Sequence, residues 1–138
     1  MNSEFTIERK LLMIGNHLFT RRDKNLQNYG ITASQSEALL FFHQHANSIV
    51  LDFAKHMMIS HQAARSIVER LKDKDLVKLE IDENDARARK VQLTDKGKSL
   101  YGELVKIGSQ EGQQILSNFT DEEKDQLVDF LERINRNL

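Results

Sequence analysis

The sequence predicts a mainly helical fold with one small β-hairpin, and three observations support this fold class. The 138-residue chain contains no proline and only six glycines, so few residues would interrupt long helices. Apolar residues recur at helical spacing over most of the chain. The segment 76–94 instead alternates apolar and charged residues, which is typical of half-buried strands. A chain of this length is expected to form a single compact domain.

The N-terminal part of the chain predicts two helices. The first runs from about Glu4 to Gln27 and carries an apolar stripe whose members fall seven residues apart. The second is expected to be capped by Ser34, with Glu37 completing a capping box. Because residues 38–42 are all apolar, this second helix should be buried. The stripe of the first helix consists of Phe5, Leu12, Phe19 and Leu26.

Two shorter helices are predicted next. Residues 49–51 are apolar and could form a lone strand that pairs with the hairpin further along the chain. A helix is then expected from Asp52 to Met58, and Ser60 is placed to cap the helix that follows it. The apolar face of that following helix is formed by Ala64, Ile67, Val68 and Leu71.

The hairpin follows the second of these helices. Residues 77–81 alternate apolar and charged side chains, and residues 91–93 repeat the pattern on the return. Residues 82–89 are too polar to be buried and are expected to form a tip with basic side chains at its end. Two short helices and a hairpin in this order are the plan of a winged helix-turn-helix, in which one helix enters a DNA groove and the hairpin contacts the backbone beside it.

Two more helices are expected to complete the chain. Thr94 is placed to cap a helix over residues 95–117, and Thr120 with Glu123 forms a capping box that opens the last helix. The last helix carries a narrow apolar seam formed by Leu127, Leu131, Ile134 and Leu138.

Charge is distributed unevenly along the chain. The formal net charge is −1, whereas DNA-binding domains are usually basic. Residues 55–90 nevertheless contain nine lysines and arginines against seven acidic residues, and residues 111–138 contain three against seven. The acidic excess is therefore expected at the C-terminal end, away from the predicted DNA-binding face.

Several function classes find no support in the sequence. No apolar run approaches the roughly 18 residues of a membrane span, and no apolar signal segment follows the N-terminus, so a cytoplasmic protein without membrane contact is expected. The absence of cysteine excludes disulfides and thiol-based redox sensing. The sequence contains no glycine-rich phosphate loop, nucleophile elbow or metal-binding His-Glu helix, so neither an enzyme nor a cofactor is expected.

Four stretches of the sequence stand in a characteristic order: Phe53-Ala54 to Ser60, Ile67-Val68-Glu69-Arg70-Leu71 leading to Leu76-Val77, Asp85-Ala86-Arg87, and Leu93-Thr94-Asp95-Lys96-Gly97. They resemble the MarR family, the multiple-antibiotic-resistance type of bacterial winged-helix regulators. Their order and spacing are together typical of that family, and the resemblance covers essentially the whole chain. Two positions depart from its pattern: Asp75 stands where a glycine is usual, and Ala86 stands where the hairpin often carries an arginine.

The resemblance implies a bacterial transcription regulator that is a homodimer and binds a pseudo-palindromic DNA operator, with repression as the favoured activity. Its dimer would place two recognition helices in successive major grooves. The narrow apolar seams of the two end helices agree with dimerisation. Under this interpretation the single domain of residues 1–138 uses residues 1–30 and 118–138 mainly for dimerisation, residues 34–94 as a DNA-binding lobe with the wing at about 76–94, and residues 95–117 as a connecting helix.

The DNA contacts are predicted on the polar face of the recognition helix and on the hairpin, although either feature could simply be solvated. Arginine can read guanine and glutamine can read adenine in the major groove, which favours Arg65 and Gln62. Glu69 would repel phosphate, so contacts should concentrate in the first turns. At the tip, Arg87 is predicted to enter the minor groove while Asp85 orients it through a salt bridge. The complete predicted set is Ser60, His61, Gln62, Arg65, Ser66, Arg70, Asp85, Arg87, Arg89 and Lys90.

The resemblance also implies a pocket for a small aromatic or amphipathic effector, whose candidate residues combine apolar walls with polar groups. Phe42 could instead be simply a core residue. The five histidines lack metal-ligand spacing, so no metal site is expected. The alternative function is a helical protein-interaction module that retains the winged-helix shape, which would not need a basic tip. The effector candidates are Leu18, Arg21, Phe42 and His43.

Overall fold

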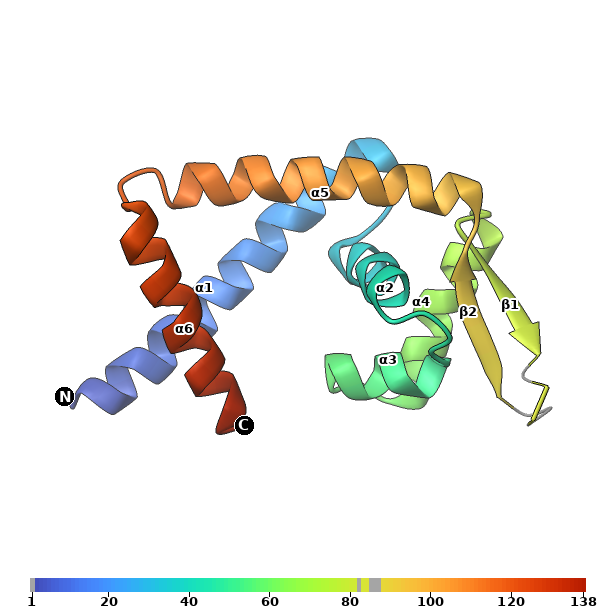
Figure 1. The fold of residues 1–138 in the computed structure, drawn as a ribbon, viewed down its shortest axis with the longest axis horizontal. Coiled ribbons are helices and arrows are strands. Elements are labelled where there is room, and N and C mark those ends of the chain that lie inside the picture. Colours follow the sequence, from blue (N-terminus) through green and yellow to red (C-terminus); the bar gives the residue numbers. More distant parts are fainter. Residues whose placement is uncertain (1, 82, 85–87) are drawn as a thin grey trace. The chain divides into compact units, whose positions relative to one another are not determined.

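The computed structural model describes residues 2–81, 83–84 and 88–138, and it confirms the predicted fold class (Figure 1). The chain divides into two compact units, Met1–Gly102 and Glu103–Leu138, called unit 1 and unit 2 here. Within the described residues, no helix combines the length and the apolar character needed to cross a membrane. The elements are α1 (Ser3–Leu26), a short 3-10 helix η1 (Gln27–Tyr29), α2 (Ala33–Gln44), α3 (Val50–Met57), α4 (His61–Asp73), β1 (Val77–Ile81), β2 (Arg89–Leu93), α5 (Asp95–Ile115) and α6 (Asp121–Arg136).

The core of unit 1 is built around α2, as its apolar sequence predicts. Phe42 packs edge-to-face on Phe41, with ring centroids 5.2 Å apart, and its ring lies 5.5 Å from that of Phe53 on α3. Packed aromatic rings of this kind add to the free energy gained by removing their area from water. The most deeply buried large side chains are Leu26, Leu39, Phe53, Val68, Leu71 and Val91, so α1, α2, α3, α4 and β2 all contribute to one core.

The start of α2 differs from the prediction. Thr32, and not Ser34, caps the helix: its side chain accepts a hydrogen bond from the backbone N–H of Gln35, and the Gln35 side chain accepts one from Thr32. The carboxylate of Asp23 on α1 accepts the N–H of Ala33 at 2.6 Å and so anchors this capped end to α1. Glu37 does not take part in the capping box but contacts His56 at 3.3 Å.

The start of α3 is a second difference. The helix begins at Val50, so residues 49–51 do not form a strand, although Ile49 makes the expected pairing with the hairpin as an isolated bridge to Lys90. The helix begins there because Asp52 accepts the backbone N–H of Ile49 at 2.9 Å, which satisfies a donor left open at a helix N-terminus.

Both helices of the helix-turn-helix end in the same Schellman arrangement. In α4 the N–H of Leu76 donates to the carbonyl of Leu71 at 2.9 Å, and Asp75 takes the left-handed conformation with φ 61°. In α3 the left-handed position is held by Met58, with φ 56°. Glycine is the usual residue at such a position, and both residues here carry the strain of a side chain in left-handed backbone.

The wing is an antiparallel pair of strands whose register sorts side chains onto two faces. Val77 lies opposite Leu93, and Ile81 lies opposite Arg89. Because side chains alternate along a strand, the buried residues Val91 and Leu93 share a face with Arg89, whereas Lys90 projects from the other face. The edge of β2 that does not pair with β1 is joined to the segment before α3, because the N–H of Val91 donates to the carbonyl of Ser48 at 3.0 Å.

Unit 2 contains the C-terminal part of α5 and the whole of α6. The predicted capping box at the start of α6 is present, with Thr120 accepting the N–H of Glu123 at 3.1 Å and Glu123 accepting the N–H of Thr120 at 2.9 Å. Large apolar side chains remain exposed along α6, among them Val128, Phe130 and Leu131.

Candidate DNA-binding site

Helix α4 has one buried face and one exposed polar face. Of the four predicted inner residues, Ala64, Val68 and Leu71 are buried and Ile67 is half-buried, which fixes the rotation of the helix about its own axis. The opposite face is therefore directed outward. The exposed polar side chains on it and its flanks are those of His61, Gln62, Arg65, Ser66, Glu69 and Arg70.

Ser60 has a structural role at the start of this helix. Its side-chain oxygen accepts a hydrogen bond from the N–H of Ala63 at 3.0 Å, as the sequence predicts for the cap. A hydroxyl that accepts a hydrogen bond still has its own proton to donate. Ser60 can therefore cap α4 and donate to a phosphate oxygen at the same time.

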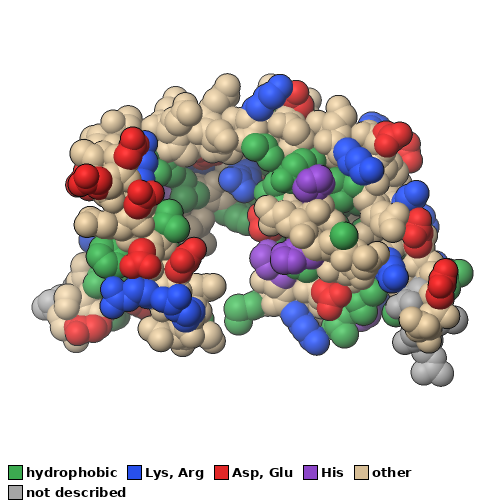
Figure 2. Space-filling view, viewed as in Figure 1, with side chains coloured by type: hydrophobic (Ala, Val, Ile, Leu, Met, Phe, Trp, Pro, Cys, Tyr) green, Lys and Arg blue, Asp and Glu red, His purple; other side chains and the backbone are tan. Residues whose placement is uncertain are grey.

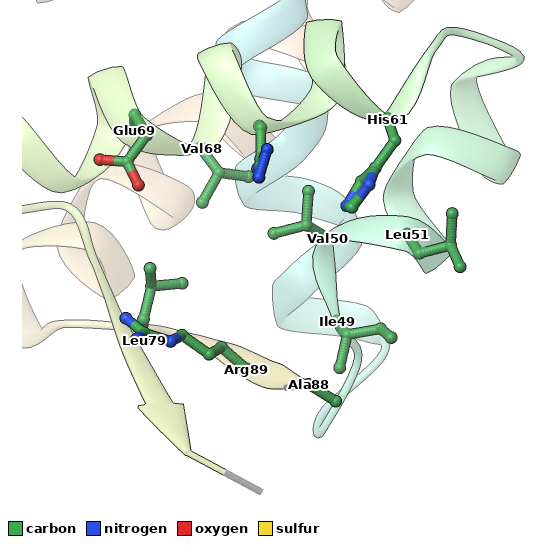
Figure 3. Close-up of a pocket in the computed structure, with 10 residues that line it drawn as sticks. Ile49, Val50, Leu51, His61, Val68, Glu69, Leu79, Ala88 and Arg89 are labelled. Atoms are coloured by element: carbon green, nitrogen blue, oxygen red, sulfur yellow. The ribbon is translucent and has the colours of Figure 1, made fainter. Parts of the chain in front are cut away.

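A hollow between α4 and the wing brings together residues that are distant in the sequence. It has a volume of about 560 Å³, and Figure 3 shows the side chains around it. His61 extends from the start of α4 toward Val50 at the start of α3, and Arg89 enters from β2. The full lining is Ile49, Val50, Leu51, His61, Arg65, Val68, Glu69, Leu79, Ala88 and Arg89.

The predicted wing residues are thus not equivalent. Arg89 lies in the hollow with Arg65, whereas Lys90 lies on the outer face of the hairpin, where it is paired in register with Glu80. The adjacent basic residues of the sequence do not form one cluster, because neighbouring strand residues point to opposite faces. The predicted contacts Asp85 and Arg87 lie outside the described residues.

The electrostatic character of the hollow comes from its side chains. His61, Arg65 and Arg89 supply the donors, and Glu69 is the acidic group in the lining. The N-terminus of α3 also borders the hollow through Val50 and Leu51, but Asp52 accepts a backbone N–H there and places a carboxylate beside it. Figure 2 shows basic and acidic side chains interleaved, rather than one continuous basic surface, on the visible face of the lobe that holds α2, α3, α4 and the wing.

The apolar part of the hollow's lining, formed by Val50, Leu51 and Leu79, is not predicted by the sequence. The sequence indicates only that Val50 and Leu51 could form a lone strand and that Leu79 belongs to the alternating pattern of the hairpin. These residues line one hollow only because α3 packs beside the wing, and no local pattern in the sequence predicts that packing. The bridge between Ile49 and Lys90 is the contact that brings the two segments together.

The four predicted effector residues have different environments. Phe42 is only 3% exposed and its ring belongs to the core. His43 is exposed, and its ring stacks on that of Tyr101 with centroids 3.7 Å apart. Leu18 and Arg21 are both half-buried on α1.

Histidine side chains gather over α2 and α3 in Figure 2. The rings of His45 and His56 each lie within 5 Å of the ring of Phe41. His56 also contacts the carboxylate of Glu37 at 3.3 Å, and Arg22 lies 4.0 Å from the same carboxylate. Among the residues that the structure describes, no group of three His, Asp or Glu side chains is placed to hold a metal ion.

The fold and the site together define a winged helix-turn-helix protein with an exposed recognition helix and a wing beside it. Residues 29–88 match the sequence model of the MarR family. The matched segment contains α2, α3, α4 and β1, so the DNA-binding lobe is similar to this family, as the sequence resemblance predicts.

Individual relatives extend the similarity over nearly the whole chain. The HTH-type transcriptional regulator PecS of Dickeya dadantii is 26% identical over 136 residues, which cover 96% of this chain and 80% of that protein. The crystal structure of a MarR transcriptional regulator from Methanosarcina mazei superposes on this chain with a TM-score of 0.90 and 25% sequence identity. The aligned part covers 98% of this chain and 96% of that one. The fold is also shared with S. aureus MepR in a complex with DNA, at 22% identity and a TM-score of 0.83, covering 95% of this chain and 96% of that one.

Proposed function

We propose that this protein is a transcription regulator that binds double-stranded DNA as a homodimer. The observation that carries the proposal is the arrangement around the hollow, where Arg65 and His61 of the exposed helix α4 and Arg89 of the wing face the same space. A helix presented in this way can enter a major groove while the wing contacts the adjacent backbone. The related MepR is known in a complex with DNA, which supports the same use of this fold.

Within this proposal the contacts have separate roles. Gln62 and Arg65, in the first turns of α4, would read base edges. Ser60, Ser66, Arg70 and Lys90 would contact phosphate or sugar, and such contacts fix register without reading sequence. Arg89 would contact the backbone from the wing. Arg87 would enter the minor groove with Asp85 orienting it.

Homodimerisation is supported by apolar surface that the single chain leaves exposed. Helix α1 exposes Phe5, Ile7 and Leu12, and α6 exposes Phe130 and Leu131. Large apolar side chains left exposed along a helix often mark an interface with another chain. A symmetric dimer formed through these helices would present two copies of α4 to a pseudo-palindromic operator.

Regulation would follow from the spacing of the two α4 helices. An effector that binds more tightly to a dimer with the wrong spacing shifts the population away from the DNA-binding geometry and releases the operator. We assign this effector to the small aromatic or amphipathic class, with Leu18, Arg21, Phe42 and His43 as candidate contacts. The protein would then act as a ligand-responsive repressor in the cytoplasm, where its DNA lies.

The alternative of a protein-interaction module without DNA binding is less well supported. Such a module would have no need for arginines from two different elements around one hollow, or for the polar face of α4. The relatives found are transcriptional regulators, which also favours a regulator over an enzyme.

The test is selection of bound sequences from random duplex DNA, followed by affinity measurements over a series of salt concentrations. We expect one enriched pseudo-palindromic motif and affinity that falls steeply with salt, because phosphate contacts release counterions. Arg65→Ala should weaken binding to the selected duplex by about 1–3 kcal/mol and binding to random DNA by less. Lys106→Ala, which removes an exposed charge from the connecting helix α5, is the control and should change neither affinity. Absence of any enriched motif would contradict the proposal.

A further inference from the structure

Lys74, at the C-terminal end of α4, is hydrogen-bonded to residues from a distant part of unit 1. Its ammonium donates to the backbone carbonyl of Gly30 at 2.6 Å and to the side-chain oxygen of Gln35 at 2.8 Å. The carbonyl of Lys74 accepts a hydrogen bond from the ammonium of Lys96 on α5 at 3.0 Å. These four residues, Lys74, Gly30, Gln35 and Lys96, are called the Lys74 cluster below.

The partners of Lys74 are themselves fixed. Gln35 is 3% exposed, and its side-chain oxygen also accepts the N–H of Thr32 in the capping box of α2. Gly30 directly follows η1 and its N–H donates to the carbonyl of Gln27 at 3.1 Å. Charge-assisted hydrogen bonds to such anchored acceptors are strong and directional. The cluster therefore connects the end of the recognition helix to the junction between α1 and α2.

We propose that Lys74 is a positioning residue for DNA recognition, because its bonds to Gly30 and Gln35 tie the end of α4 to the segment that joins α1 to α2 and so restrict the angle between α1 and α4. The inference rests on the proposed function, in which α1 contributes to the dimer interface and α4 reads DNA. If α1 is held by the partner subunit, the angle between α1 and α4 sets the distance between the two recognition helices. That distance determines which half-site spacing the dimer accepts.

A direct contact between Lys74 and phosphate is the competing explanation. The predicted base contacts lie in the first turns of α4, whereas Lys74 lies at its other end and directs its ammonium toward Gly30 and Gln35. The two explanations differ in their consequences. A phosphate contact contributes equally to all duplexes and to the salt dependence, whereas a positioning residue contributes to the choice between duplexes.

The experiment compares three duplexes: one selected by the wild-type protein from random DNA, the same duplex with one base pair inserted at its centre, and a random duplex. Lys74→Met removes the ammonium while keeping a similar length, and Lys72→Met removes an exposed charge from the same turn as the matched control. We expect Lys74→Met to lose about tenfold in affinity for the selected duplex, comparable to one misplaced base contact. The preference for the selected over the inserted duplex should fall with it, while random-duplex affinity changes little.

The conservative variant and a second variant complete the test. Lys74→Arg keeps a cationic donor and should restore most of the preference. Lys96→Met removes only the hydrogen bond to the Lys74 carbonyl and should lower the preference for the selected over the inserted duplex by a smaller factor. This variant tests the inference even if Lys74→Met does not fold. Folding of each variant is checked by circular dichroism.

Two results would overturn the inference while leaving the proposed function intact. One is an unchanged preference in folded Lys74→Met, or in Lys96→Met if the former is unfolded. The other is an equal loss on all three duplexes with a shallower salt dependence, which would make Lys74 a phosphate contact. If the wild type enriches no duplex at all, the proposed function fails and the role of Lys74 in recognition fails with it.

Discussion

Alanine at position 97 is expected to destabilise the protein, although alanine favours helices more than glycine does. Gly97 is the third residue of α5, and a Cβ atom placed there would overlap the carbonyl oxygen of Leu76. That carbonyl is fixed, because it accepts the N–H of Thr94 at 3.1 Å while the N–H of Leu76 donates to Leu71. The overlap can therefore be relieved only by moving the backbone of α5 away from the end of α4.

The expected magnitude follows from three contributions. Overpacking against a fixed group costs about 1–3 kcal/mol. The shift weakens the hydrogen bond between Thr94 and Leu76, which costs about 1 kcal/mol. The higher helix propensity of alanine offsets about 1 kcal/mol. The free energy of unfolding of Gly97→Ala should accordingly fall by about 1–3 kcal/mol.

The assay is urea denaturation followed by circular dichroism, with Gly102→Ala as the matched control in the same helix. Gly102 is exposed and no atom lies within 4 Å of a Cβ built on it, so alanine there should raise the free energy of unfolding by about 0.5–1 kcal/mol. The two substitutions are the same chemical change and should have opposite signs. Stabilisation by both would refute the close contact between Gly97 and Leu76.

Three further predictions follow from the structure and the sequence. Met58→Gly should raise the free energy of unfolding by about 0.5–1 kcal/mol in calorimetry, because Met58 holds a left-handed conformation and is 91% exposed; a lower melting temperature would contradict this. Replacing Leu131 and Ile134 by glutamate should give unfolded or aggregated chain, and a well-folded wild-type monomer in sedimentation at micromolar concentration would disprove the obligate dimer. Asp85→Ala should weaken duplex binding, and adding it to Arg87→Ala should cost little more; tighter binding by Asp85→Ala would exclude the orienting role.

The sequence predicted best those elements in which the spacing of apolar residues allows only one face to point into the core. The spacing of Ala64, Ile67, Val68 and Leu71 permits only one inward face for α4; Ile67 is half-buried and the other three are buried. The alternation in the hairpin likewise permits one inward face, on which Val77, Val91 and Leu93 are buried. Patterns of this kind are dictated by which side chains can leave water, so tertiary contacts do not alter them.

The cap of α2 was mispredicted because two capping boxes overlap in the sequence. Both Thr32 with Gln35 and Ser34 with Glu37 have the required spacing. Tertiary contacts favour the first: Lys74 bonds to Gln35, and His56 takes the carboxylate of Glu37. Residues that are far away in the sequence therefore decided between two locally equivalent starts.

In the candidate site too, features set by local sequence patterns were predicted and features set by tertiary packing were not. The polar face of α4 could be predicted because it is the complement of the buried face. The separation of Arg89 from Lys90 was not predicted, because residues 82–89 were expected to form the tip, whereas β2 begins at Arg89 and side chains alternate from there. The hollow itself depends on the packing of α3 beside the wing, which the bridge from Ile49 to β2 establishes.

Strand β2 is hydrogen-bonded along both edges, to β1 and to Ser48. Changes in the length of the tip and insertions within β2 should therefore affect Arg89 differently. A slip of β2 by one residue would break its pairing with β1 and with residues 48–49, and it would turn Val91 outward. The place of Arg89 is therefore set by its distance along the strand from Val91. Insertions or deletions within residues 82–87 would leave Arg89 where it is, whereas one residue inserted at position 90 would move it to the opposite face. Variants with altered operator preference should accordingly be sought by changing the length of the tip, with the strand kept constant.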